Sequence, residues 1–75
     1  MCGIIGYSGS NTNAVELLLE GLEKVEYRGY DSAGIAFVTD SGIQIEKKEG
    51  KLENLKNHMK NFEILSCTGI GHTRW

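Results

Sequence analysis

The spacing of hydrophobic positions changes along the chain, and each change predicts a different element. Residues 2–8 form a short apolar run interrupted by glycines, which is typical of a strand buried on both faces. Asn13, followed three residues later by Glu16, resembles a capping box, so a helix should begin just after it. Apolar residues then recur at helical spacing, with charged residues between them, at Val15, Leu18, Leu19, Leu22 and Val25.

The remaining positions predict a hairpin, a second helix and a final strand. Residues 32–39 are an apolar run, 40–42 read as a turn, and apolar and polar residues alternate over 43–46. A second amphipathic helix is predicted from the spacing of Leu52, Leu55, Met59 and Phe62. Strand character returns over 64–74. Gly21 costs the first helix about 1 kcal/mol relative to alanine, which indicates close backbone packing there.

Length, charge and cysteine content limit the classes of protein that fit. The 75 residues allow one domain with a thin core, and a net charge of -2 gives no reason to expect nucleic acid as a partner. Neither a signal peptide nor a membrane helix fits the apolar start, so we expect a cytoplasmic protein that does not bind membranes. Both cysteines are expected to be free thiols, although a Cys2–Cys67 disulfide stays open, and no metal site or cofactor is predicted.

Cys2 is the residue with the most suggestive position. If Met1 is removed, its thiol and its own α-amine lie a few bonds apart, and the amine can relay the thiol proton during acyl transfer. The two pKa values start near about 8.5 and about 7.8, so both groups lie close to neutrality. The plainer interpretation is a small buried hydrophobe at the start of a strand.

The other chemistry-bearing residues each have a structural alternative. Arg28 and Asp31 could form a turn ion pair worth less than about 1 kcal/mol. Trp75 could be a core or interface aromatic, and His72 a satisfied polar residue within a strand. His58, in a lysine-rich helix, is expected to be a solvated surface residue.

Three segments carry a family resemblance that covers the whole chain in order. Residues 1–6 (MCGIIG), 26–35 (EYRGYDSAGI) and 69–75 (GIGHTRW) resemble the start of the glutaminase domain of glucosamine-6-phosphate synthases. These enzymes belong to the wider class of N-terminal-nucleophile glutamine amidotransferases. The class shares the Cys-Gly-Ile start, whereas the middle segment resembles the synthases in particular.

The resemblance implies a role for each matching residue. Cys2 matches the nucleophile that attacks the side-chain amide of glutamine, and Arg74 matches the arginine that holds the α-carboxylate of glutamine. Thr73 belongs to the same motif and is predicted to bind substrate. Arg28 is expected to support the nucleophile, and Trp75 matches the tryptophan that gates the ammonia channel. The implied substrates are glutamine and, through domains that the chain lacks, fructose 6-phosphate.

The implied fold is α/β: a four-layer α-β-β-α sandwich of the N-terminal-nucleophile type, present only in part. Residues 1–75 match the beginning of the glutaminase domain, and its remainder, with the oxyanion-hole donors, and the sugar isomerase domains are missing. We therefore expect the chain alone to be nearly inactive, and the full-length enzyme to be a homo-oligomer. The abrupt end at Trp75 suggests a truncation or processing product. Two alternatives stay open: another amidotransferase of the same class, or a non-catalytic fragment.

Overall fold

The computed structural model describes residues 3–10, 12–25, 31–60 and 64–74. It has mixed α and β structure, as the hydrophobic pattern predicts. In chain order, the elements are β1 (Gly3–Ser8), α1 (Ala14–Val25), β2 (Ser32–Thr39), β3 (Gly42–Glu49), α2 (Leu52–Met59) and β4 (Thr68–Arg74).

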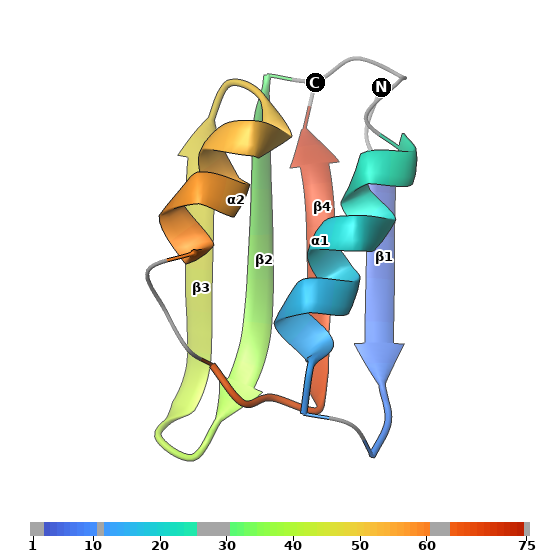
Figure 1. Ribbon diagram of the computed structural model, residues 1–75, viewed down its shortest axis with the longest axis vertical. Coiled ribbons are helices and arrows are strands. Elements are labelled where there is room, and N and C mark those ends of the chain that lie inside the picture. The colour runs from blue at the N-terminus through green and yellow to red at the C-terminus, as the bar shows by residue number, and fades with distance from the viewer. Residues whose placement is uncertain (1–2, 11, 26–30, 61–63, 75) are drawn as a thin grey trace.

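The four strands form one antiparallel sheet in the order β1-β4-β2-β3 (Figure 1). The last strand lies between the first and the second, so the two chain-distant strands β1 and β4 are neighbours. Their register pairs Gly3 with Thr73 and Ser8 with Thr68. On its other side β4 pairs with β2, where Ser32 faces Arg74. The start of β1, the end of β4 and the start of β2 therefore lie together at one end of the sheet.

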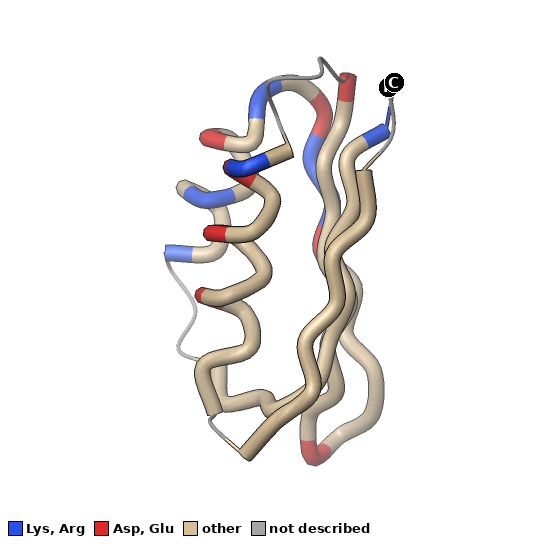
Figure 2. The backbone as a smooth tube through the Cα atoms, turned by 90° about the vertical axis from the view of Figure 1, so that its right-hand side faces the viewer, with Lys and Arg blue, Asp and Glu red and all other residues tan. Residues whose placement is uncertain are grey.

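Both helices cover the same face of the sheet, which gives two layers (Figure 2). The core lies between these layers, where the apolar stripes of the helices meet alternate residues of β2. Its buried members are Leu18, Leu22, Ala33, Ile35, Phe37, Leu52, Leu55 and Met59. Burial of a large aliphatic or aromatic side chain of this kind stabilises a fold by about 1.5–3 kcal/mol.

Helix α1 packs closely against the sheet at Gly21, as predicted from the presence of a glycine there. Gly21 is buried in the middle of α1, and a Cβ at this position would collide with the side chain of Ile5 from β1. The helix begins at Ala14, whose backbone N–H donates to the carbonyl oxygen of Ser66 at 2.9 Å. The helix start and the close packing predicted at Gly21 are both confirmed.

The predicted hairpin is confirmed, and two other elements are shorter than predicted. Strands β2 and β3 pair from Thr39 and Gly42 onward, and Gly42 has a φ of 122°, which favours glycine. The second helix ends at Met59, and Phe62 lies outside the described residues. The last strand begins at Thr68 rather than at residue 64. Before it, Ser66 forms an isolated bridge with Asn13, the residue that precedes α1, and not a continuous strand.

The face of the sheet opposite the helices is uncovered, and we refer to it as the open face. Its apolar half is built from adjacent strands, with exposed fractions of 56% for Ile70, 48% for Val38, 73% for Ile43 and 61% for Ile45. The prediction that the first strand is buried on both faces is therefore wrong for this chain. Strand β1 is an edge strand in which Ile4 is 79% exposed, because no described element covers that face.

No helix in the described part of the chain is both long enough and apolar enough to cross a membrane.

Candidate active site

The three motif segments meet at one end of the sheet (Figure 1). Gly3, next to Cys2 in sequence, pairs with Thr73, and Arg74 pairs with Ser32 of the middle segment. Cys2, Arg28 and Trp75 themselves lie outside the described residues. Their predicted roles stay predictions, but Gly3 and Arg74, which adjoin Cys2 and Trp75 in the sequence, lie on neighbouring strands at this end of the sheet.

Arg74 is exposed and lies on the open face, because the preceding Thr73 points into the helix-covered layer. Its carbonyl oxygen accepts a 2.7 Å hydrogen bond from the N–H of Asp31, and the carbonyl oxygen of Asp31 accepts a 2.8 Å bond from the N–H of Gly50. These bonds tie the end of β4 to the segments before β2 and after β3. The backbone that carries the guanidinium is thereby held in place.

An open hollow of about 660 Å³ adjoins Arg74. It is lined by Asp31, Ser32, Lys47, Lys48, Glu49, His72 and Arg74. The lining has charges of both signs, and the guanidinium supplies planar donors that match a carboxylate. A ligand with both a carboxylate and a cationic group would find partners for each in this hollow.

Gly34 makes room for two of the lining side chains. A Cβ at Gly34 would lie 2.7 Å from Cγ of Lys47 and 2.8 Å from Nε2 of His72. The two side chains therefore lie over β2 from its opposite neighbours, β3 and β4. His72 is half-buried within a strand, as predicted.

Thr73 has a different environment from Arg74. Its side chain is 2% exposed, and its Oγ1 accepts a 3.1 Å hydrogen bond from the backbone N–H of Gly3. Its predicted contact with substrate stays a prediction. No pattern in the sequence indicates the bond to Gly3, since the two residues are 70 positions apart.

Cys67 lies at the opposite end of the sheet from Gly3. Its carbonyl oxygen accepts a 3.0 Å hydrogen bond from the N–H of Gly9, just beyond the end of β1, and its thiol is free. The other cysteine of the disulfide left open by the sequence, Cys2, lies outside the described residues. Among the described residues, no group of three or more His, Cys, Asp or Glu side chains could hold a metal ion.

A polar cluster between α2 and β3 escaped the sequence reasoning. His58 Nε2 lies 2.9 Å from Oε1 of Glu46, and Oε2 of Glu46 accepts a 2.9 Å bond from Nε2 of Gln44. The hydrogen bonds from Gln44 and His58 lower the pKa of Glu46 below its ordinary value of 4.5. The prediction of a solvated His58 is wrong, because His58 follows the buried Leu55 by three positions and so borders the apolar stripe of α2.

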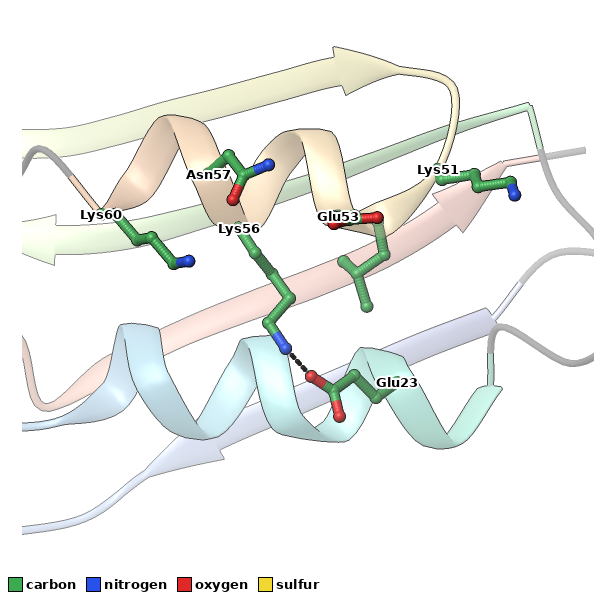
Figure 3. Close-up of a pocket in the computed structure, with 7 residues that line it drawn as sticks. Glu23, Lys51, Glu53, Lys56, Asn57 and Lys60 are labelled. Carbon is green, nitrogen blue, oxygen red and sulfur yellow. Dashed lines mark hydrogen bonds and ion pairs between the residues drawn. The ribbon is translucent and has the colours of Figure 1, made fainter.

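A second hollow lies between the helices, on the layer opposite Arg74. Figure 3 shows Lys56 of α2 reaching toward Glu23 of α1, with which it forms an ion pair. The two side chains are 40% and 42% exposed, so the pair contributes at most about 1 kcal/mol to stability. The hollow lies in the helix layer and carries none of the predicted site residues.

Comparison with known proteins identifies relatives along the whole chain, although no family model matches it. A protein of Fusobacterium nucleatum subsp. nucleatum is 95% identical over all 75 residues, and relatives from Synechocystis sp. and Clostridium acetobutylicum are 59% and 53% identical. All three are named glutamine–fructose-6-phosphate aminotransferase (isomerizing).

The match covers 100% of this chain but only 12% of each of these relatives, at their N-terminal end. The alignment includes all three motif segments, since it covers the whole chain. The resemblance inferred from the motifs is confirmed: along its whole length, the chain corresponds to the N-terminal segment of the glutamine–fructose-6-phosphate aminotransferase family.

Proposed function

We propose that the chain is the N-terminal part of a glutaminase domain, in an enzyme that transfers the amide nitrogen of glutamine to fructose 6-phosphate. The observation that carries this proposal is the match, along the whole of this chain, to the N-terminal 12% of relatives whose names state both substrates. The convergence of the three motif segments at one end of the sheet supports it. The further expectations of a cytoplasmic homo-oligomer belong to the same proposal.

In the proposed chemistry, Cys2 acts after Met1 has been removed. The thiol sulfur attacks the side-chain amide carbon of glutamine, the carbon–nitrogen bond breaks, and the thiol proton passes through the α-amine to the leaving ammonia. Water then hydrolyses the γ-glutamyl thioester, which releases glutamate and restores the thiol. The ammonia adds to fructose 6-phosphate in domains beyond this segment.

The position of Arg74 supports its proposed role in substrate binding. Arg74 is exposed at the edge of a hollow at the end of β4. The residue before it, Thr73, pairs with Gly3 at the start of β1. A bidentate bond to the α-carboxylate would orient the glutamine side chain toward the strand that follows Cys2. Asp31 and Glu49 in the same hollow favour a zwitterion over a simple anion.

The open face supports a larger sandwich, in which a second sheet packs on the first. Four large apolar side chains form its apolar half, toward the end of the sheet remote from Arg74, and Ile4 of β1 is exposed on the same face beside His72. Contiguous apolar surface of this kind is typical of a face that becomes buried. The polar half, around His72 and Lys47, would then line the substrate pocket between the two sheets. We expect little activity from the chain alone, because loss of a single oxyanion donor costs about a hundredfold to a thousandfold in rate.

The test uses the full-length Fusobacterium nucleatum enzyme with its N-terminal 75 residues replaced by this chain. We refer to this protein as the chimera. The Cys2→Ala variant should lose glutamine hydrolysis and glutamine-dependent amination of fructose 6-phosphate, because no other thiol carries an adjacent α-amine. Cys67→Ala, at the other end of the sheet, is the matched control and should keep both activities.

Several results would contradict the proposal. Retention of glutamine hydrolysis by Cys2→Ala would refute the nucleophile assignment. If glutamine turnover of the chimera rose with an acceptor other than fructose 6-phosphate, the chain would belong to a different amidotransferase. If an electrophilic glutamine analogue failed to label Cys2 in the chimera, as measured by intact mass, a non-catalytic role would be favoured.

A further inference from the structure

The side chain of Thr73 joins the end of β4 to the start of β1. It is buried, and its Oγ1 accepts a 3.1 Å hydrogen bond from the N–H of Gly3. The two residues are also register partners in the sheet. The hydroxyl therefore adds a specific bond to the strand pairing at the residue that directly follows Cys2.

The N–H of Gly3 belongs to the peptide unit that begins at Cys2. A peptide unit is planar, with a rotation barrier of about 18–20 kcal/mol, so the direction of its N–H fixes the plane that also holds the preceding carbonyl and Cα. The thiol and the α-amine of Cys2 are both attached to that Cα. A group that holds the N–H of Gly3 thus restrains the atom from which both reacting groups extend.

Gly3 is also confined on the side of the helices. A Cβ at Gly3 would lie 3.0 Å from Cγ2 of Val25 and 3.2 Å from Oγ1 of Thr73. The backbone therefore rests directly on these two side chains, one at the end of α1 and one on β4. Val25 acts as a steric stop, whereas Thr73 supplies the directional bond.

We propose that Thr73 is a positioning residue for the nucleophile, acting through the backbone of Gly3. This inference rests on the proposed function, because it requires Cys2 to be the attacking group. It differs from the substrate contact that the family resemblance implies, since the hydroxyl acts on the enzyme's own main chain. Displacement of a reacting group by about 1 Å can reduce a rate by about a hundredfold.

Two variants of Thr73 in the chimera test the contribution of its hydroxyl and that of its methyl group separately. Thr73→Val keeps the shape and removes the hydroxyl, and it should lower kcat for glutamine hydrolysis by about tenfold to a hundredfold, with KM within about threefold of the parent. Thr73→Ser keeps the hydroxyl and loses the methyl group, and its kcat should stay within about threefold of the parent. Rates are expressed per active site, titrated with an electrophilic glutamine analogue, so that any unfolded fraction is not counted.

Thr68→Val is the matched control at the other end of β4. Its Oγ1 lies 3.4 Å from Oγ of Ser8 on β1, and the pair is exposed. The same substitution therefore removes a side-chain contact between the same two strands, remote from Gly3. We expect this variant to hydrolyse glutamine at the parent rate.

The kcat values of the three variants distinguish a positioning role of Thr73 from a packing role. The proposal is overturned if Thr73→Val keeps its kcat within about threefold, if Thr73→Ser is as slow as Thr73→Val, or if Thr68→Val loses as much. A rise in KM with kcat unchanged would instead indicate the substrate contact. If Cys2→Ala keeps glutamine hydrolysis, the proposed function itself fails, and that result is distinct from every outcome at Thr73.

Discussion

Replacement of Gly21 by alanine sets helix propensity against packing in the middle of α1. Alanine gains about 1 kcal/mol over glycine in a helix interior. Its Cβ, however, would collide with Cδ1 of Ile5 and lie 3.1 Å from Cγ1 of the same side chain. Overpacking of this kind costs about 1–3 kcal/mol, because Ile5 must leave its rotamer or α1 must move away from the sheet. We expect a net loss of about 1 kcal/mol.

The loss is measurable in the chimera by hydrogen exchange, with mass spectrometry of peptides from α1 and β1. A loss of about 1 kcal/mol corresponds to roughly fivefold faster exchange in these peptides. Glu20→Ala serves as the control, because it changes helix propensity on the exposed side of the helix, away from Ile5. That variant should shift the exchange rate by less than about twofold.

A double-mutant cycle isolates the steric term. Ile5→Val removes Cδ1 and should cost about 0.5–1.5 kcal/mol alone, but it should cost nothing or be favourable beside Gly21→Ala. We expect a coupling energy of about 1 kcal/mol or more between the two positions. If Gly21→Ala slows exchange in α1, as propensity alone requires, the close-approach argument is wrong.

Two further predictions concern the polar cluster and the open face. Hydrogen bonds with Gln44 and His58 lower the pKa of Glu46, so its bond to His58 stabilises the docking of α2 above pH 4.5 and is lost as the pH falls through the lowered value. Hydrogen exchange in α2, corrected for intrinsic rates, should become faster over this acidic range in the parent chimera. In Glu46→Gln it should change much less with pH, and an equal pH dependence of the two proteins would contradict the role of Glu46. Ile70→Lys should reduce stability of the chimera by more than about 2 kcal/mol in urea unfolding if a second sheet covers the open face, whereas the exposed Asn57→Lys should be neutral. A neutral Ile70→Lys would show that this face stays in water.

The local elements follow from sequence patterns because each depends on neighbouring residues. The apolar spacing in α1 and the turn at Gly42 can each be recognised within the 12 residues of one helix or the few residues of one turn, and both are confirmed. The burial of β1 was predicted wrongly because an apolar run looks the same whether its second face is covered by this segment or by another part of the protein. Ile4 shows the difference, since it is apolar and almost fully exposed.

The candidate site shows the same difference between features that depend on neighbouring residues and features that depend on distant ones. Motifs predict Cys2 as a nucleophile and Arg74 as a substrate-binding residue, but the surroundings of the site depend on pairing between distant strands. The bond from Gly3 to Thr73 and the pair of His58 with Glu46 each join two elements, and no periodicity within one element encodes such a partner. The sequence therefore predicts candidate groups for the site, whereas their partners follow only from the fold.

The place of β4 between β1 and β2 has a consequence for synthesis of the protein. Gly3 and its partner Thr73 are 70 residues apart, so among the described strands β1 finds its partner only after β4 has left the ribosome. At about 5–20 residues per second, this interval lasts roughly 4–14 s, whereas the hairpin of β2 and β3 can form in microseconds once synthesised. We expect β1 to be added last to the sheet. If Cys2 acts as proposed, an aminopeptidase would have this interval to remove Met1 before β1, the strand that follows Cys2, is paired.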